Sequence, residues 1–152
     1  RGQGRTGRLS RGTDRVAEVA RGPLRPDPRL AAQDKIVFLV ENDEDLRRAL
    51  GLLLEKWGVS VLDAASGEEA LALIEELGIL PDLFLVDQHL GDGLAGIDLV
   101  RLLRARYGPV PARIITANRS PEIRAQCAAA GLGLLMKPID PRALQAALQD
   151  PG

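Results

Sequence analysis

The sequence has few aromatic residues, a single cysteine and no long apolar stretch. Aromatic residues make up 3% of the 152 residues, so the core has to be built from leucine, isoleucine, valine and alanine. Cys127 is the only cysteine, which excludes an internal disulfide and a cysteine-based zinc site. No apolar run reaches the roughly 18 residues that a membrane-spanning helix needs. We therefore expect a cytoplasmic domain in a reducing environment, without membrane contact of its own.

The length suits one domain with a hydrophobic core, and the charges divide the chain in two. Residues 1–34 contain eight arginines against four acidic residues, which gives a net charge of +4, and they are rich in glycine and proline. We interpret them as a basic linker or as the truncated end of a preceding domain, and residues 35–149 as the folded domain. Basic charge attracts nucleic acid, but residues 1–34 include no aromatic side chain to stack on a base. No nucleic-acid partner is predicted.

From residue 35 onward, short apolar segments alternate with segments of helical periodicity. The apolar segments that we predict as strands are 36–40, 59–62, 83–86, 113–116 and 132–136. Ser66, Ser120 and Asp140 are expected to cap three of the intervening helices at their amino ends. Such alternation predicts an α/β fold with a parallel sheet covered on both faces. Right-handed crossovers favour the flavodoxin-like doubly wound (βα)5 topology with strand order 2-1-3-4-5.

Four of the five predicted strands end in polar side chains of different kinds. The first is followed by Glu41 and Asn42, the third by Asp87, and the fourth ends in Thr116. The fifth runs into Lys137. Sites in open parallel sheets form outside the carboxyl ends of the strands, where the strand order reverses. We therefore expect these side chains to lie together at one edge of the sheet.

Carboxylates that crowd together raise one another's pKa unless a cation joins them. Oxygen ligands from Glu41, Asp87 and Asn42 suit a hard divalent ion, and we predict Mg²⁺ because it tolerates retained water ligands. A carboxylate can also act as a nucleophile and form an aspartyl phosphate. The metal and the Lys137 ammonium would then offset charge on the phosphoryl oxygens, while the Thr116 hydroxyl donates a hydrogen bond to the group.

The order and separation of these motifs resemble the response-regulator receiver family of two-component signalling. The resemblance covers about residues 35–148 and rests on Glu41-Asn42, Asp87, Thr116-Ala117 and Lys137-Pro138 taken together. It implies that Asp87 is phosphorylated by a phosphohistidine on a histidine kinase or a histidine phosphotransfer protein. It also implies that Mg²⁺ is bound by Glu41, by Asp87 and by the backbone carbonyl of His89, and that the bond before Pro138 is cis.

Three features depart from the common family pattern. Asn42 stands where a second acid is usual, and Leu134 stands where an aromatic ring often swings inward on phosphorylation. The loop over residues 89–96 is one residue longer than usual and lacks its proline, which resembles receivers at the carboxyl end of hybrid sensor histidine kinases. We expect His89 and Asn118 to line the site mouth and to tune dephosphorylation.

These observations predict a phosphoacceptor domain, phosphorylated at Asp87, from a hybrid sensor histidine kinase that could itself be membrane-anchored. The chain starts at Arg1 and its only methionine is Met136, so we expect it to be part of a longer protein. The alternatives are a stand-alone response regulator and a pseudo-receiver that only binds proteins. Whether the chain counts as an enzyme stays open, since an isolated domain would catalyse only its own phosphorylation and dephosphorylation. A homodimer through the face of the fourth helix and fifth strand is a further expectation.

Two other functions of an Asp-bearing α/β domain fit less well. A haloacid dehalogenase-type phosphohydrolase needs a second aspartate two residues after the nucleophile, and His89 stands there. A flavin-binding module needs a phosphate loop after the first strand, where Glu41 and Asp43 would repel a phosphate. Both are rejected.

Overall fold

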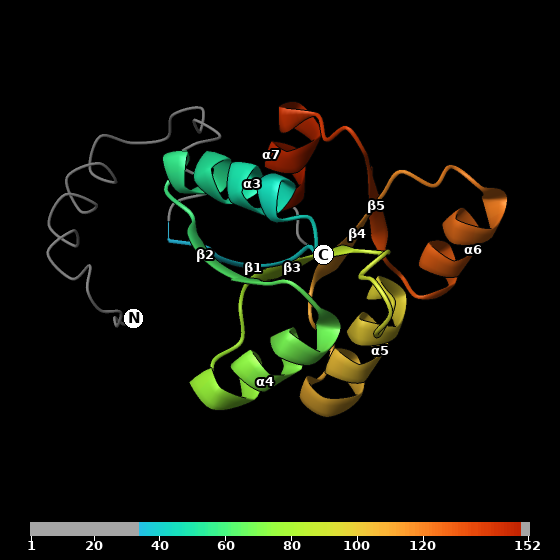
Figure 1. The fold of residues 1–152 in the computed structure, drawn as a ribbon, viewed down its shortest axis with the longest axis horizontal. Helices are drawn as coiled ribbons and strands as arrows, with labels where there is room; N and C mark the ends of the chain where they lie inside the picture. The colour runs from blue at the N-terminus through green and yellow to red at the C-terminus, as the bar shows by residue number, and fades with distance from the viewer. Residues whose placement is uncertain (1–33, 150–152) are drawn as a thin grey trace, which may run out of the picture.

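A computed structural model describes residues 34–149 as one five-stranded parallel sheet with helices on both of its faces (Figure 1). The strands are β1 (Ile36–Val40), β2 (Ser60–Ala64), β3 (Leu83–Asp87), β4 (Ala112–Thr116) and β5 (Gly133–Met136). The helices are α3 (Glu44–Lys56), α4 (Gly67–Leu77), α5 (Gly96–Tyr107), α6 (Pro121–Ala129) and α7 (Pro141–Gln149). The strand order is β2-β1-β3-β4-β5, which confirms the predicted topology. The interpretation of residues 1–34 as a linker lies outside the described residues, apart from Asp34.

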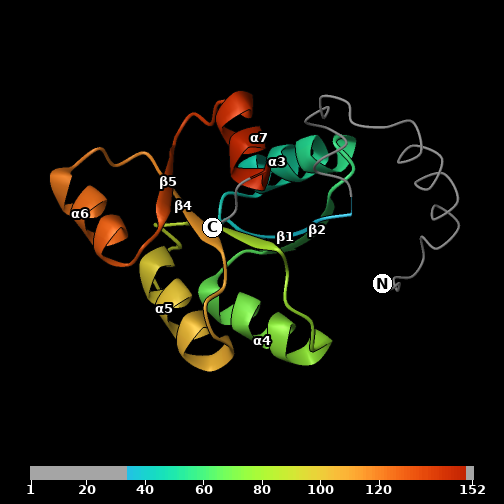
Figure 2. The same ribbon diagram turned by 180° about the vertical axis from the view of Figure 1, so that it is seen from behind.

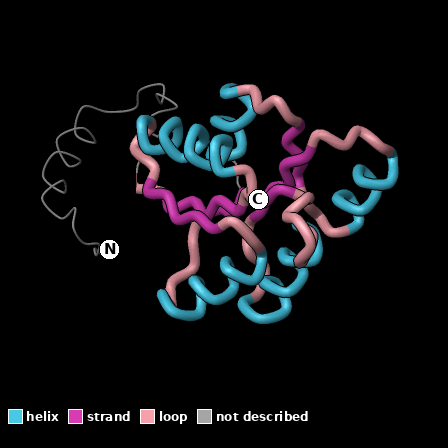
Figure 3. Tube along the Cα trace, in the orientation of Figure 1, coloured by secondary structure: helices cyan, strands magenta, loops and turns pink. Residues whose placement is uncertain are grey.

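The sheet forms a central layer between two sets of helices (Figure 3). Helices α3 and α7 cover one face, and α4, α5 and α6 cover the other, as both ribbon views show (Figures 1 and 2). A hydrophobic core lies on each face of the sheet, and each strand contributes side chains to both cores because successive side chains point to opposite faces. In β1, Val37 and Leu39 pack under α3 and α7, whereas Phe38 and Val40 pack with α4 and α5. None of the helices in the described part of the chain has the length and hydrophobicity of a membrane span.

The helix starts follow the signals in the sequence. The Ser66 hydroxyl accepts a hydrogen bond from the Glu69 backbone N–H at 3.1 Å, so it caps α4. At α7, a carboxylate oxygen of Asp140 accepts from the Arg142 N–H at 2.9 Å. Ser120 caps α6 in the same way and is followed by proline at the first helical position. These contacts satisfy N–H groups that have no partner inside the helix.

Helix α5 approaches the end of β3 so closely that position 96 has no room for a side chain. A Cβ at Gly96 would overlap the backbone carbonyl oxygen of Asp87. The Gly96 N–H donates to the Gln88 carbonyl at 3.0 Å, and the Gln88 side chain accepts from the Ile97 N–H at 2.9 Å. The amino end of α5 is therefore fastened directly to Asp87 and the residue after it.

Candidate functional site

The parallel register brings four strand ends to the same edge of the sheet. Val40 of β1 lies opposite Val86 of β3, so that the residues after them, Glu41 and Asp87, are neighbours. Asp87 lies opposite Ile115 of β4, one residue before Thr116. Thr116 in turn lies opposite Met136 of β5, immediately before Lys137, whose N–H donates to the Thr116 carbonyl at 2.9 Å.

At this edge the Lys137 ammonium lies between two buried carboxylates. Its Nζ donates a hydrogen bond to Asp87 Oδ2 at 3.0 Å and lies 3.3 Å from Glu41 Oε1. Glu41 is fully buried and Asp87 is 3% exposed, whereas the Lys137 side chain is 26% exposed. The contact with Glu41 has the distance of an ion pair without hydrogen-bond geometry, so Glu41 Oε1 has no hydrogen-bond partner among the described residues.

Two carboxylates therefore share one cation, and this arrangement affects the pKa of Glu41. The pKa of Glu41 is raised to about 7, mainly by burial and further by the neighbouring Asp87 carboxyl group. The Asp43 N–H, which donates to Glu41 Oε2 at 3.1 Å, and the Lys137 charge act in the opposite direction without outweighing the rise. For Lys137, burial lowers the pKa, but the hydrogen bond and charge of Asp87, together with Glu41, outweigh it and raise the pKa.

The residues present fit a magnesium ion. Glu41 Oε1 has no hydrogen-bond partner among the described residues, and the pKa of Glu41 is raised, so that Glu41 and Asp87 together can accept a second cation. Within residues 34–149 no three Asp, Glu, His or Cys side chains gather as a ligand cluster. Two carboxylates, backbone carbonyls and water would therefore make up the shell, and Mg²⁺ is the common ion that is bound in this way. Asn42 is exposed on the loop that follows β1.

Two other predicted residues lie on the loops around Asp87. The side chain of His89 is exposed, and its backbone N–H donates to Asp87 Oδ1 at 3.1 Å. The peptide bond between Lys137 and Pro138 is cis, which is the geometry that the resemblance implies. His89 thus contacts the proposed nucleophile through its backbone.

Thr116 and Asn118 are linked through the loop after β4. Thr116 is fully buried, and its Oγ1 accepts a hydrogen bond from the Asn118 N–H at 3.0 Å, which leaves the hydroxyl hydrogen free to donate elsewhere. The Asn118 side-chain oxygen accepts from the Ser120 N–H at 2.9 Å. Asn118 therefore helps to shape the entry to α6, and its amide nitrogen keeps two further donors.

Sequence reasoning missed Arg47, Gln88 and Gly96. Arg47 reaches back from α3, where its Nη1 donates to the Glu41 carbonyl at 2.7 Å and its Nε lies 3.7 Å from Asp63 Oδ1. It holds the turn that carries Glu41. The only signal in the sequence is that Arg47 follows the acidic loop closely and that Gln88 comes directly after Asp87. Both side chains act by binding backbone atoms, and a pattern of residue types does not reveal such contacts.

The chain is similar to known proteins over most of its length. The response regulator receiver domain family matches residues 37–149 of the chain. A cyclic di-GMP phosphodiesterase of Thermotoga maritima is 33% identical over 105 residues, which cover 68% of this chain and 27% of that protein. The transcriptional regulatory protein AfsQ1 of Streptomyces coelicolor is 32% identical over 114 residues, covering 74% of this chain and 49% of that one.

Solved structures with the same fold include other receivers. The chemotaxis protein CheY4 of Vibrio cholerae superposes with a TM-score of 0.69 at 29% identity, covering 76% of this chain and 96% of that chain. A CheY-like response regulator receiver domain protein of Methanospirillum hungatei gives a TM-score of 0.69 at 27% identity, covering 76% and 91%.

The matched region is the common part of proteins that otherwise differ. The chain spans about a quarter to a half of the length of the curated relatives that it matches. The matched region contains every strand and helix described above except the first residue of β1, and it includes the edge that holds Glu41, Asp87, Thr116 and Lys137. The chain belongs to the response regulator receiver domains of two-component signalling.

Proposed function

We propose that the chain accepts a phosphoryl group on Asp87 from a phosphohistidine of a histidine kinase or a histidine phosphotransfer protein. An Asp87 carboxylate oxygen attacks the phosphorus, the phosphorus–nitrogen bond breaks, and the imidazole leaves with its electron pair and takes up a proton. Later attack by water releases inorganic phosphate and restores the carboxylate. The observation that carries this proposal is the Lys137 ammonium at 3.0 Å from Asp87 Oδ2, beside a second buried carboxylate.

Each neighbouring group has a part in this reaction. The Lys137 ammonium orients Asp87 and binds a phosphoryl oxygen as a point charge, and the Thr116 hydroxyl donates a hydrogen bond to another oxygen. Glu41 and Asp87, with the His89 carbonyl, would hold Mg²⁺, which when bound supplies positive charge to the phosphoryl oxygens. Asn42 adds a neutral oxygen at most. The exposed His89 side chain and Asn118 border the site, and we assign them an influence on the dephosphorylation rate.

The signal would pass to the face formed by α6 and β5. Thr116 ends β4, Lys137 follows β5, and their backbones share a hydrogen bond, so movement of both toward the phosphoryl group repacks this face. Helix α6 buries only Ile123 and Cys127, which makes it the least anchored of the helices on that side. Leu134 is partly buried against the same core and offers no aromatic ring to the switch. We also propose that a homodimer can form through this face.

Two parent proteins are compatible with this domain. The loop over residues 89–96 favours a hybrid sensor histidine kinase. The relatives favour a regulator with its own output domain, since their names describe a phosphodiesterase and transcriptional regulators. Both use the same phosphoryl chemistry at Asp87.

The proposal is tested by incubating the chain with a small acyl-phosphate donor and Mg²⁺ and measuring the intact mass. We expect a single phosphoryl adduct that is lost in Asp87→Asn and on removal of Mg²⁺. Asp92→Asn, an exposed change in the neighbouring loop, serves as the control and should keep the adduct. No adduct at any donor concentration would instead support a pseudo-receiver that acts only by binding proteins.

A further inference from the structure

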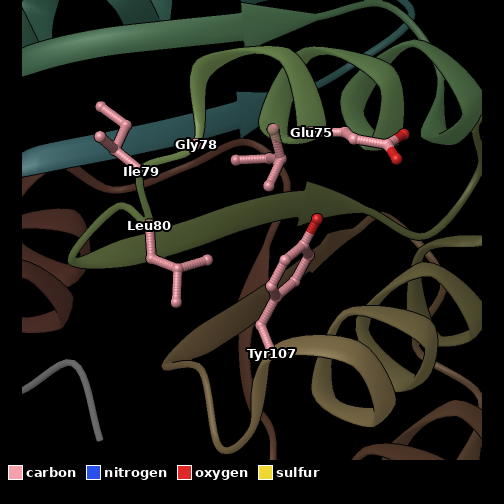
Figure 4. Close-up of a pocket in the computed structure, with 6 residues that line it drawn as sticks. Glu75, Gly78, Ile79, Leu80 and Tyr107 are labelled. Atoms are coloured by element: carbon pink, nitrogen blue, oxygen red, sulfur yellow. The ribbon is translucent and has the colours of Figure 1, made fainter.

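An apolar pocket opens at the edge of the sheet opposite Asp87. Its volume is about 420 Å³, and it is lined by Ile74, Glu75, Gly78, Ile79, Leu80 and Tyr107 (Figure 4). The Tyr107 ring, at the end of α5, stands across from the loop that carries Ile79 and Leu80 (Figure 4). A second hollow of about 310 Å³ lies between the same two helices and is lined by Leu71, Leu102, Ala105 and Arg106. We call the two hollows together the α4–α5 groove.

Large apolar side chains are exposed around this groove. Ile79, Leu80 and Leu102 are 47%, 46% and 45% exposed, and they are three of the five large hydrophobic residues that are exposed within residues 34–149. Single exposed leucines are normal, but a group of them beside a pocket indicates a surface that binds another protein.

The two walls of the groove carry opposite charges, one on each wall. Glu75 lies on the α4 wall and Arg106 on the α5 wall, and neither makes an ion pair with another described residue. Helix α4 contains four glutamates and no basic residue, and Glu75 is the one that lines the groove. In the last turn of α5, Arg106 lines the groove, whereas Arg104 donates to the backbone carbonyls of Val110 and Ala130. An acidic wall beside a basic wall is complementary to the same surface of a second copy after a two-fold rotation.

We propose that the α4–α5 groove is the contact between two copies of this chain in an isologous dimer. Leu102 of each copy enters the pocket between Leu80 and Tyr107 of the other, and Arg106 of each copy faces Glu75 of the other. The contact then has an apolar centre with charged pairs at its rim, which is the usual anatomy of a protein interface. Ile79, Leu80 and Leu102 of each copy are removed from water at this contact, and this burial of apolar surface drives the association.

This contact is independent of phosphorylation. The groove lies beside the loops that lead into β3 and β4, while Asp87 lies at the other end of β3. It therefore differs from the α6–β5 face, whose packing would respond to the phosphoryl group. The dimer through the groove forms whether or not Asp87 can be modified.

Sedimentation velocity of the full chain over a range of concentrations tests the proposal. We expect a concentration-dependent dimer in the wild type and in Asp87→Asn, and at least a tenfold higher dimer dissociation constant in Leu102→Glu. Leu52→Glu is the matched control, because Leu52 is 62% exposed on α3, away from the groove. Thermal melts of each variant establish that the fold is kept.

Charge-reversal variants distinguish this specific dimer from nonspecific association. Glu75→Arg and Arg106→Glu should each weaken the dimer, and the double variant should regain most of the affinity because the pair is restored in the opposite sense. A chain that is monomeric at every concentration overturns the proposal, whether the groove then binds the basic residues 1–34 or another protein. A dimer that Leu102→Glu leaves intact overturns it as well.

Discussion

The Nζ of Lys137 lies 3.0 Å from Asp87 Oδ2 and 3.3 Å from Glu41 Oε1, so one ammonium serves two buried carboxylates. Bringing two negative charges out of water costs several kcal/mol unless cations compensate them. One lysine offsets part of that cost and leaves the site short of one positive charge. This imbalance explains how an acidic pocket can attract a divalent cation and, with its help, a phosphoryl group.

Removing the shared cation should destabilise the domain in a pH-dependent way. With the metal chelated, we expect Lys137→Met to lose about 2 kcal/mol of unfolding free energy at pH 8, since two buried carboxylates lose their partner. At pH 5 the loss should be smaller because Glu41, with its pKa of about 7, is already protonated. Urea unfolding at both pH values measures this, with Lys56→Met at the exposed end of α3 as the control. Equal losses at pH 5 and pH 8 would contradict it.

The raised pKa of Glu41 predicts that the metal-free domain loses stability as the pH rises. An acid with a pKa of about 7 in the folded state and 4.5 in the unfolded state binds more protons when folded. The contribution of Glu41 to the free energy of unfolding therefore decreases as the pH rises from 4.5 to about 7. The difference corresponds to about 3 kcal/mol as an upper bound. Glu41→Gln removes the titrating group, and its stability should therefore rise relative to the wild type from pH 4.5 to 7. Parallel pH profiles of the two proteins in chelator would refute the assignment.

Much of the fold could be predicted because the sequence encodes it locally. The strand order followed from alternating apolar segments, and the helix starts followed from Ser66, Ser120 and Asp140. The ends of the strands could be predicted less closely. β2 was predicted at residues 59–62 and lies at Ser60–Ala64, since pairing with β1 extends it to the partner of Val40. A register imposed by a neighbouring strand is not visible in a single segment.

The composition of the site could be predicted, but its geometry could not. The ends of four strands carry two carboxylates, a hydroxyl and an amine, and this pattern indicated that Glu41, Asp87, Thr116 and Lys137 lie together. The sequence does not reveal that Lys137 contacts Glu41 as well as Asp87, because that depends on side-chain conformations at three separate strand ends. Nor does it reveal that Arg47 binds the Glu41 carbonyl, or that α5 contacts the Asp87 backbone at Gly96.

Gly96→Ala should disturb the fold and the site together. The added Cβ would overlap the Asp87 carbonyl oxygen, so α5 or the end of β3 has to move. We expect a loss of about 1–3 kcal/mol in unfolding free energy and slower phosphoryl labelling of Asp87. Gly51→Ala is the matched control, because a Cβ there meets nothing within 4 Å in the middle of α3, and it should be neutral or stabilising. If Gly96→Ala were as stable and as reactive as Gly51→Ala, then α5 could shift to accommodate the Cβ without loss of stability or of labelling rate, which would contradict the prediction.

Replacing the neutral Asn42 with an acid should strengthen magnesium binding. Asn42→Asp adds a carboxylate next to Glu41 on the loop after β1, and a hard dication gains more from an anionic oxygen than from an amide. We expect the Mg²⁺ dissociation constant, measured by titration calorimetry at pH 8, to fall roughly tenfold. Without metal the same variant should be less stable than the wild type, since the added charge repels Glu41 and Asp87. Glu44→Gln, on the exposed first turn of α3, controls for general charge. An unchanged dissociation constant would place the cation away from this loop.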